Sequence, residues 1–326
     1  MSDDFRLIFA RTGGPDVIER ATITPPRPGP NEAVVRHQAI GLNFIDTYQR
    51  SGLYPLPLPS GLGSEAAGVV EAVGSAVTDL RPGQRVAYAS GPPGAYATVR
   101  AIAADLLVPL PETIDARIAA AAMLKGLTVD MLVGDCGRVQ PGQTLLVHAA
   151  AGGVGSLLVP WLKALGATVI AHVGAPAKVA RVEALGADVV LSCPMETLAE
   201  AVRDATGGRG VDSVFDGVGR ASWDASIAAL ARRGLMVSYG NASGAVPPVE
   251  PLALARAGSL FLTRPTLFDY TDTPERRRAA SARLFAMIES GKVPVEIGQT
   301  FPLADAARAH QALADRATTG STILLP

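Results

Sequence analysis

Two different patterns of apolar and polar positions occur along this chain, one in its first 100 residues and one in its centre. Over residues 1–100, short runs rich in apolar and β-branched residues are separated by turns that contain Pro and Gly. The candidate strands cover residues 5–10, 33–39, 68–73, 85–88 and 95–100. Short strands joined by such turns are typical of a small barrel-like β unit.

The second pattern begins near residue 144, where strand-like runs alternate with segments of helical spacing. The candidate strands cover residues 144–147, 168–173, 189–191, 213–216, 235–239 and 259–263. The candidate helices cover residues 156–165, 177–185, 198–205 and 222–231. This alternation predicts an α/β domain with a doubly wound parallel sheet, covered by helices on both faces.

We expect the two ends of the chain to share one domain. An Ala-rich helical run over 116–132, which contains Gly126, marks the change from the first pattern to the second. After Pro274 the pattern predicts a helix to about residue 290, a strand near Gln299, a helix over 305–314 and a strand over 321–325. These elements continue no β-α-β series. Residues 267–326 are therefore expected to complete a first domain of residues 1–124, with a central domain of residues 125–266.

Composition removes several classes of function. The chain has 326 residues, enough for two domains, of which 48% are hydrophobic and 18% charged. A formal net charge of −1 provides no basic field to hold nucleic acid by its phosphates. The two cysteines, Cys136 and Cys193, exclude a disulfide framework and a four-cysteine zinc lobe. Residues 1–11 carry no export signal and no apolar run reaches the ~20 residues that span a bilayer, so we expect a cytoplasmic protein.

The stretch QTLLVHAAAGGVG, residues 143–155, has the context of a dinucleotide-binding turn. A short apolar strand leads into small residues and then into a helix, the order that such a turn requires. Small residues let the backbone approach a pyrophosphate, and a helix N-terminus presents N–H groups to it. Ala150 replaces the first Gly of G-x-G-x-x-G, so an ordinary tight turn between strand and helix is the alternative.

The residues after the second strand of this domain favour NADP over NAD. In NAD-binding folds, an acid about 20 residues after the glycines binds the ribose hydroxyls. Here residues 172–178 read HVGAPAK, with Gly174 and Lys178 but no acid. A lysine attracts a 2′-phosphate, whereas a carboxylate would repel it. The alternative for Lys178 is a solvated lysine at the start of a helix.

A second candidate site lies in residues 41–55, GLNFIDTYQRSGLYP. Asn43, Tyr48 and Tyr54 place hydrogen-bonding groups next to apolar side chains, a mixture that suits the wall of a small-ligand pocket. The alternative is a surface loop closed by a helical turn, with the tyrosines half-buried. Taken alone, the stretch favours the loop.

Seven segments together resemble the quinone oxidoreductases, which belong to the zinc-free branch of the medium-chain dehydrogenase/reductase superfamily and include ζ-crystallin. They are GLNFIDTYQRSGLYP, GLGSEAAGVV, AAMLKGLT, VHAAAGGVG, RRGLMVSYGNASGA, FLTRPTL and RAHQALADRATTGS, and they run from end to end of the chain. The resemblance implies a GroES-like β-barrel domain built from both chain ends, a central Rossmann domain, a homodimer and NADPH-dependent reduction of quinones.

The resemblance also implies roles for individual residues. It places Asn43, Tyr48 and Tyr54 in the substrate pocket, where they would position the quinone and hydrogen-bond its developing oxyanion. Lys178 and Arg316 would hold the 2′-phosphate of NADPH. The residues implied to bind the cofactor are Asn43, Thr128, Gly152, Gly153, Val154, Gly155, Gly174, Lys178, Cys193, Val218, Gly240, Asn241, Ser243, Leu262, Thr263, Arg264 and Arg316.

The chain departs from the family pattern at several positions. Zinc enzymes of the superfamily carry Gly-His-Glu where this chain has Gly63-Ser64-Glu65, so we expect no metal and interpret Glu65 as structural. Ala175 replaces a frequent hydroxyl residue, and Cys193 stands where Tyr is frequent. Both losses would weaken phosphate and adenosine contacts and reduce the preference for NADP. Cys193 would be a reactive thiol beside the adenosine site or a buried thiol at a strand end.

Hydride transfer to a quinone needs closeness and alignment more than an acid or base. The proton would come from water or from Tyr54, and the sequence leaves both open. Two other functions remain open: reduction of an alkenal or enone on the same scaffold, and a non-catalytic NADPH-binding role, crystallin-like or RNA-binding. The net charge of −1 and the lack of a basic stripe with aromatic residues argue against RNA.

The four histidines have plainer interpretations than a role in the chemistry. His148 follows the first strand of the central domain, where a structural role is commoner than a catalytic one. His37, His172 and His310 are scattered along the chain and show no metal-ligand spacing.

Overall fold

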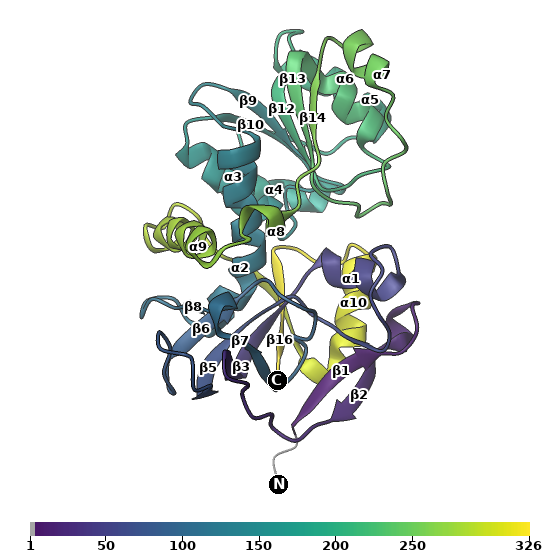
Figure 1. The fold of residues 1–326 in the computed structure, drawn as a ribbon. Coiled ribbons are helices and arrows are strands. Elements are labelled where there is room, and N and C mark those ends of the chain that lie inside the picture. The colour runs from purple at the N-terminus through teal and green to yellow at the C-terminus, as the bar shows by residue number, and fades with distance from the viewer. Residues whose placement is uncertain (1–3) are drawn as a thin grey trace. The chain divides into compact units, whose positions relative to one another are not determined.

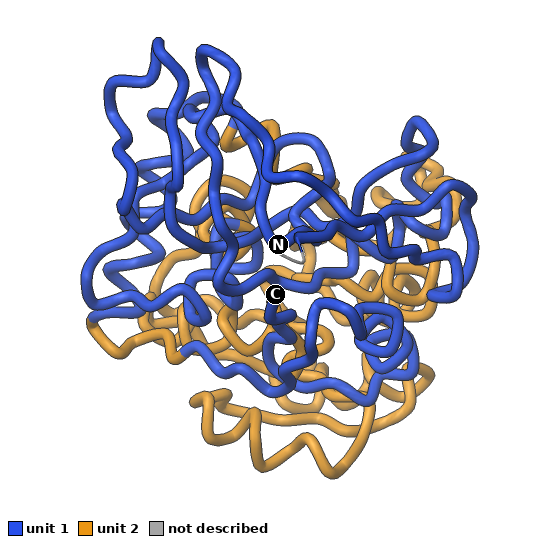
Figure 2. The backbone as a smooth tube through the Cα atoms, turned by 90° about the horizontal axis from the view of Figure 1, so that it is seen from below, with its two compact units in different colours: residues 1–127, 272–289, 295–326 blue, residues 128–271, 290–294 orange. Residues whose placement is uncertain are grey.

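The structure is a computed structural model that describes residues 4–326. Residues 1–3, part of the N-terminal stretch for which we expect no export signal, lie outside the described residues. The chain divides into two compact units (Figure 2). Unit 1 contains residues 1–127, 272–289 and 295–326, and unit 2 contains residues 128–271 and 290–294.

The first division between the units lies inside one unbroken helix, α2 (Ala116–Met131). The expected domain bounds of 124/125 and 266/267 differ from the divisions at 127/128 and 271/272. A continuous helix carries no linker composition, so the sequence has no local signal at this position.

Unit 2 is built on one sheet of six strands in the order β11-β10-β9-β12-β13-β14 (Figure 1). The strands are β9 (Thr144–Val147), β10 (Thr168–His172), β11 (Val189–Leu191), β12 (Val211–Asp216), β13 (Leu230–Ser238) and β14 (Phe261–Thr263). All neighbouring pairs are parallel, which confirms the expected doubly wound sheet. In such a sheet, ligands bind beyond the carboxyl ends of the strands, where the strand order reverses.

Six helices belong wholly to unit 2: α3 (Gly155–Ala164), α4 (Val179–Ala184), α5 (Met195–Ala205), α6 (Trp223–Ala229), α7 (Pro251–Arg256) and α8 (Leu267–Tyr270). Four adjacent strands bury an apolar row on one face of the sheet, formed by Leu146, Ile170, Val214 and Met236. Apolar residues of α5 and α6 pack against this row. Removing this apolar surface from water holds the two helices on the sheet.

One expected helix is wrong at its end. The pattern predicts a helix over 222–231, but α6 ends at Ala229 and β13 begins at Leu230. Leu230 pairs with Val211 of β12, and the register then shifts before Leu235 pairs with Ser213. Long-range pairing with β12 therefore overrides the helical spacing of these residues.

Unit 1 contains two sheets. The larger has the order β15-β16-β3-β5-β6-β8, with β7 also paired to β3, and the smaller has the order β2-β1-β4. The strands are β1 (Phe5–Phe9), β2 (Glu19–Thr22), β3 (Glu32–Leu42), β4 (Ser60–Gly61), β5 (Glu65–Val73), β6 (Arg85–Tyr88), β7 (Val99–Ala103), β8 (Val108–Pro109), β15 (Ile297–Pro302) and β16 (Ser321–Leu325). β16 is antiparallel to β3, so the end of the chain completes a sheet that begins near its start.

Three further helices belong to unit 1: α1 (Phe44–Ser51), α9 (Pro274–Glu289) and α10 (Ala306–Ala314). Short 3₁₀ helices cover Pro15–Val17, Ala104–Leu106, Pro176–Lys178 and Leu303–Asp305, and a π-helical turn covers Leu132–Cys136. One apolar core joins β1, β3, β5, β6 and α10, with Phe9, Ile40 and Tyr88 fully buried.

The expected strand over 95–100 is wrong over residues 95–98, because β7 begins at Val99. The N–H of Tyr96 donates to the carbonyl of Leu62 at 2.9 Å, and the carbonyl of Tyr96 accepts from the N–H of Leu7 at 2.8 Å. These bonds tie an irregular segment to β1 and to the residue after β4, both of the smaller sheet. The Tyr96 side chain is fully buried there, which explains its strand-like apolar signal.

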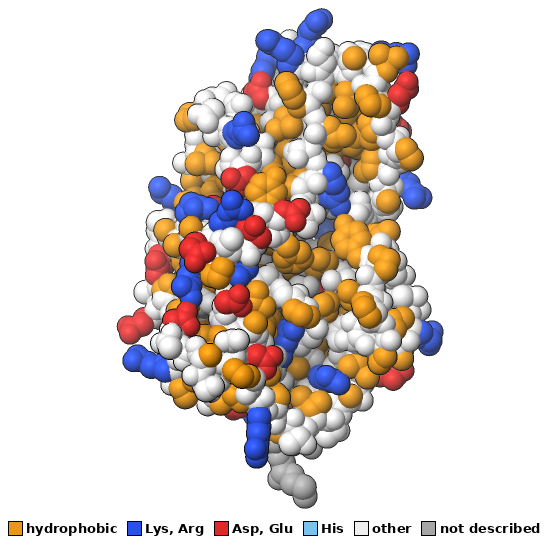
Figure 3. Space-filling model, viewed as in Figure 1, with side chains coloured by type: hydrophobic (Ala, Val, Ile, Leu, Met, Phe, Trp, Pro, Cys, Tyr) orange, Lys and Arg blue, Asp and Glu red, His pale blue; other side chains and the backbone are white. Residues whose placement is uncertain are grey.

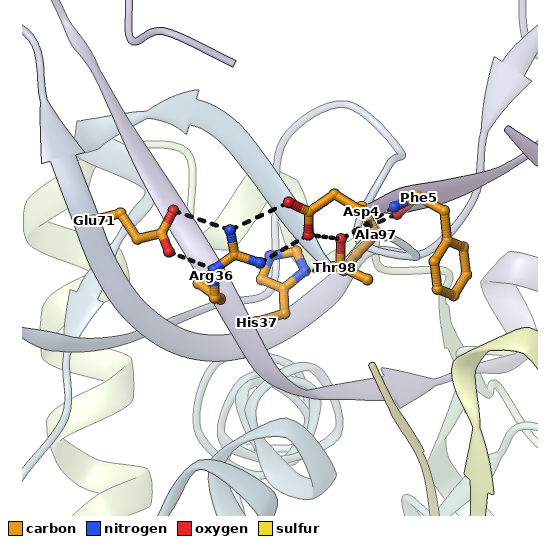
Figure 4. A network of polar contacts seen from close by, with 7 residues as sticks. All are labelled: Asp4, Phe5, Arg36, His37, Glu71, Ala97 and Thr98. Atoms are coloured by element: carbon orange, nitrogen blue, oxygen red, sulfur yellow. Dashed lines mark hydrogen bonds and ion pairs between the residues drawn. The ribbon is translucent and has the colours of Figure 1, made fainter. Parts of the chain in front are cut away.

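A polar network joins the segment before β1 to strands β3 and β5 (Figure 4). Arg36 Nη1 donates to Asp4 Oδ1 at 2.8 Å, and the same guanidinium pairs with Glu71. Thr98 Oγ1 donates to Asp4 Oδ1 at 2.7 Å. The hydrogen bonds to Asp4 and then Glu71 raise the pKa of Arg36 above its usual value.

Among residues 4–326, no helix has both the length and the apolar character to cross a membrane. On the face drawn in Figure 3, basic and acidic side chains are interspersed and do not gather into a field of one sign. That face therefore offers no continuous basic surface to a phosphate backbone.

Candidate functional site

The turn after β9 is tight where it meets α3, so that residue 155 has no room for a side chain. Ala149 has a φ of 50°, and the N–H of Gly152 donates back to its carbonyl at 2.9 Å. A Cβ on Gly155 would lie 2.5 Å from the Ala149 carbonyl oxygen and 2.6 Å from Ala150 Cα. Ala150 has no positive φ, which explains why alanine is accepted there.

Three of the expected cofactor residues, Gly152, Gly153 and Val154, lie half-buried along this turn and lead into α3. Gly155 is the buried first residue of that helix. The turn thus presents backbone, and little side chain, at the carboxyl edge of the sheet. Such a surface can approach a pyrophosphate closely.

The segment after β10 carries only positive charge. Gly174 is exposed, and a Cβ built on it would meet open space. Lys178 ends the 3₁₀ helix Pro176–Lys178 and is half-buried. Arg181 follows in α4, and no Asp or Glu occurs between Lys178 and Glu183. An anionic group would be attracted here by Lys178, the cation that sequence reasoning singled out.

The loops after β12 and β13 are tied to each other. The N–H and the hydroxyl of Ser243 both donate to the carbonyl of Val218, each at 2.8 Å. A Cβ on Gly240 would lie 2.4 Å from the carbonyl oxygen of Gly217, so the two loops touch backbone to backbone. The N–H of Gly244 donates to the carbonyl of Asn241 at 2.9 Å and closes the second loop. The structure therefore brings together Val218, Gly240, Asn241 and Ser243.

A buried carboxylate that sequence reasoning missed organises these loops. Asp216, the last residue of β12, is fully buried and accepts from the N–H of Val218 at 2.7 Å and of Gly219 at 3.2 Å. The hydroxyls of Ser222 and Ser226 donate to its other oxygen at 2.6 and 2.8 Å. Asp216 thus fixes the start of the loop that contains Val218.

His148 belongs to the same buried cluster. Its Nε2 lies 2.9 Å from the Ser226 hydroxyl, whose proton goes to Asp216, so Nε2 carries the hydrogen and donates. Burial lowers the pKa of His148 to about 4, so the ring is neutral. The structural interpretation of His148 agrees with this arrangement. The sequence did contain a signal for this cluster, because His148 and Asp216 lie at the carboxyl ends of two adjacent strands of the sheet.

The remaining expected residues of unit 2 are dispersed. Arg264, just after β14, donates to the carbonyl of Ser238 at 2.8 Å, while Leu262 and Thr263 lie on β14 itself. Thr128 is a half-buried residue of α2. Cys193 is also half-buried, packs against the α5–α6 core, and accepts from His172 Nε2 through its carbonyl at 3.0 Å. These contacts favour the second of the two alternatives for Cys193, a thiol packed at the end of a strand.

Unit 1 holds the expected substrate residues on and around α1. Asn43 caps α1 and is buried, with its N–H donating to Asp46 Oδ2 at 2.9 Å. The rings of Tyr48 and Tyr54 meet edge to face with centroids 5.2 Å apart. Phe44, 37% exposed, extends this group, with its ring centroid 6.1 Å from that of Tyr48. The expected loop is thus a helix with an aromatic cluster, whereas Arg316 lies exposed after α10.

Two family models match the chain. Residues 29–112 match the alcohol dehydrogenase GroES-like domain, and residues 185–324 match zinc-binding dehydrogenases. A quinone oxidoreductase of Pseudomonas aeruginosa is 52% identical over 322 residues, which cover 98% of this chain and 99% of that protein. The chain belongs to the quinone oxidoreductase family.

The fold agrees with this membership over the whole chain. The crystal structure of Escherichia coli quinone oxidoreductase complexed with NADPH is 48% identical, with a TM-score of 0.96, and the match covers 99% of this chain and 100% of that one. The expected combination of a Rossmann sheet and a GroES-like domain is therefore confirmed. Another relative, a 2-haloacrylate reductase of Burkholderia, is 39% identical over 327 residues, 98% of each chain.

One of the matched families is described as zinc-binding, but the residues of this chain do not fit zinc. Ser64, which replaces the histidine of the zinc enzymes, donates its hydroxyl to Asp46 Oδ1 at 3.1 Å. The neighbouring Glu65 is engaged in an ion pair with Lys125 at 3.0 Å. Within residues 4–326, no group of three or more His, Cys, Asp or Glu side chains could hold a metal ion. We therefore derive no step through a metal.

Unit 2 fits a dinucleotide with a 2′-phosphate. The Gly155 turn leaves no room for a Cβ, the adjoining segment carries Lys178 and Arg181, and the loops of Val218 and Ser243 lie at the same edge of the sheet. These are the parts that a Rossmann domain uses for pyrophosphate and ribose.

Proposed function

We propose that this protein transfers a hydride from NADPH to a quinone without a metal. One observation carries the proposal: a chain that is 52% identical to a quinone oxidoreductase end to end combines a glycine turn after β9 with Lys178, in place of an acid, after β10. The bound NADPH supplies the hydride. Closeness and alignment in the site account for the acceleration, since a quinone accepts electrons readily.

Each group of residues has its part in this proposal. The backbone of residues 152–155 holds the pyrophosphate, and Lys178 and Arg316 attract the 2′-phosphate. The loops of Val218, Gly240, Asn241 and Ser243 line the nucleotide. Gly174 and Cys193 face its adenosine end, and Thr128, Leu262, Thr263 and Arg264 its nicotinamide end. Asn43, Tyr48 and Tyr54 position the quinone, and Asn43 also contacts the nicotinamide ribose.

Reduction to the hydroquinone requires one hydride and one proton. The aromatic cluster of Tyr48 and Tyr54 suits a flat ring, because aromatic pairs prefer edge-to-face or offset contact. Donors near the quinone oxygen stabilise the negative charge that develops there. The proton comes from the Tyr54 hydroxyl or from water, and quinone kinetics of Tyr54→Phe separate these two sources: unaltered kinetics remove Tyr54 from the role.

The test is a steady-state assay with NADPH and NADH against 1,4-naphthoquinone and other quinones. We expect turnover with NADPH at a lower KM than with NADH. Lys178→Ala should raise the KM for NADPH about tenfold and leave the KM for NADH within twofold, since only NADPH carries the 2′-phosphate. Absence of quinone-dependent NADPH oxidation would refute the function.

The 2-haloacrylate reductase at 39% identity supports a second candidate, reduction of an activated alkene such as an enone or alkenal. The hydride would then reach carbon and the proton its neighbouring carbon. Measuring kcat/KM for 2-alkenals beside that for naphthoquinone separates the two. A third candidate, a non-catalytic NADPH-binding protein, predicts NADPH binding with no acceptor reduced at all.

A homodimer through β14 is part of the proposal. β14 is the last strand of its sheet, and Phe261 and Leu262 on it are 62% and 36% exposed. Edge strands with large apolar side chains favour pairing with another copy. Sedimentation should give a dimer, Phe261→Asp should give monomer, and Leu58→Asp, at a 43% exposed leucine of unit 1, should leave the dimer intact.

We also place the protein in the cytoplasm. Its two cysteines, Cys136 and Cys193, are free, which suits a reducing compartment. Fractionation of cells that express the tagged protein tests this location.

A further inference from the structure

The Glu65 side chain extends from strand β5 to helix α2. Glu65 is the first residue of β5, it is fully buried, and it lies opposite Gly41 of β3 in the strand register. A Cβ on Gly41 would lie 2.1 Å from Glu65 Oε1 and 2.3 Å from the carbonyl oxygen of Ala120 in α2. The missing side chain at residue 41 therefore opens the path by which the Glu65 carboxylate reaches α2.

The carboxylate is surrounded by donors. Its Oε1 accepts from Asn43 Nδ2 at 2.7 Å and from Lys125 Nζ at 3.0 Å, and its Oε2 accepts from the N–H of Leu124 at 2.6 Å. The side chains of Glu65 and Lys125 are 0% and 6% exposed. A buried ion pair of this kind adds little to stability compared with apolar residues of the same size. Its presence beside Asn43 therefore calls for a reason other than stability.

The contact with Asn43 provides that reason. The terminal torsion of an asparagine is soft, so an amide without a firm partner samples many orientations. A carboxylate that accepts from every neighbour requires the nitrogen, and not the oxygen, of the Asn43 amide to face it. One N–H of the amide is then committed to Glu65, which sets the plane of the amide and the direction of its second N–H.

We propose that Glu65 is a positioning residue that orients the Asn43 amide for the quinone, with Lys125 neutralising its charge. This inference rests on the substrate role proposed for Asn43. Lys125 matters because an uncompensated carboxylate would repel the negative charge that grows on the quinone oxygen. Glu65 itself touches neither substrate nor cofactor and acts only through Asn43.

Two double variants test the inference, and both remove the charges of the pair. Glu65→Leu with Lys125→Met leaves Asn43 without its acceptor, whereas Glu65→Gln with Lys125→Met keeps an amide oxygen that Asn43 Nδ2 can reach. We expect the Leu variant to lose about 10²-fold in kcat for naphthoquinone at saturating NADPH, as misplacement of a positioning group does. The Gln variant should stay within about threefold of the wild type, which a general loss of stability would not produce.

Asn43→Ala tests whether Glu65 acts through Asn43. Added to the Leu variant, it should cause no further loss in kcat, because the two changes remove the same interaction. Additive losses, or wild-type kcat in the Leu variant, would overturn the role of Glu65. If the wild type reduces no quinone, the proposed function fails, and crystal structures of the two double variants still decide the inference. The Asn43 amide should keep one orientation in the Gln variant and lose it in the Leu variant; one shared orientation would overturn the proposal.

Discussion

The hydroxyl of Tyr96 donates to Asp46 Oδ2 across 3.1 Å, between two side chains that are both fully buried. On its other side this hydroxyl lies 3.0 Å from Nε2 of His310. Burial raises the pKa of Asp46 to about 7, despite hydrogen bonds from the N–H of Asn43, from Ser64 and from Tyr96. A buried carboxyl group of α1 therefore changes charge near neutral pH.

Asp46→Asn should become more stabilising, relative to the wild type, as the pH rises. The folded pKa of about 7 lies above the ordinary 3.8, so the folded wild type holds a proton between these values that the unfolded chain lacks. The contribution of Asp46 is therefore full below pH ~4 and is lost as the pH rises to ~7. The difference between the two proteins should grow by about 4 kcal/mol over this window.

Urea unfolding at half-unit steps from pH 4.5 to pH 8 measures this difference. His37, His148 and His310, whose pKa values burial lowers to about 4, 4 and 3, act in the opposite sense, since the unfolded chain gains their protons below pH 6.5. They occur in both proteins and cancel. A difference that is constant with pH would show that Asp46 does not titrate near 7.

Gly126→Ala should destabilise the protein although alanine favours helices. Gly126 lies inside α2, and a Cβ there would lie 2.3 Å from Leu284 Cδ1 and 2.7 Å from its Cδ2. Leu284 of α9 is fully buried and has little room to move. Overpacking of about 1–3 kcal/mol should exceed the ~1 kcal/mol gain in helix propensity. Chemical denaturation of Gly126→Ala, alone and combined with Leu284→Val, measures the change in the free energy of unfolding. The Leu284→Val change should restore stability. A net gain in stability from Gly126→Ala alone would contradict the packing argument.

Asp216→Ala should weaken NADPH binding. The carboxylate accepts the N–H groups of Val218 and Gly219, and its loss leaves the loop start without these bonds. Loss of about 1.5 kcal/mol of loop ordering raises the Kd about tenfold. Ser226→Ala is the matched control, because it removes a donor to the other oxygen and leaves both N–H bonds, so its Kd should change less than about twofold. Titration of NADPH fluorescence reports both values, and equal Kd values would remove the role of Asp216.

Arg36→Leu should cost about 1 kcal/mol of unfolding free energy. Its guanidinium joins Asp4 to Glu71, but its side chain is 38% exposed and Glu71 is 37% exposed, so solvent screens part of the attraction. Asp4, only 4% exposed, loses a cation in the variant. Urea unfolding at 0.05 and 1 M salt checks this: the loss should be smaller at high salt, and a loss independent of salt would point to packing instead.

The local features of unit 2 could be predicted from the sequence. The strands Thr144–Val147 and Val189–Leu191 are found where the apolar runs place them, and the turn at Gly155 follows the first of these. The missing acid before Lys178 is also a local feature. Such features follow from periods of two and 3.6 residues and from single glycines, which act over one turn of chain.

The partners of buried polar groups were decided by the tertiary structure. From the sequence, Glu65 is only the remainder of a lost zinc pattern, yet it contacts Asn43 from 22 positions away and Lys125 from 60. Ser226 reaches His148 across 78 positions. Burial removes competing water, so each of these groups must find a protein partner, and which partner it finds depends on how distant strands and helices meet. The sequence by itself therefore determined most strands of unit 2 and the glycine turn after β9, whereas the orientation of Asn43 and of the loop at Val218 was decided only when the chain folded.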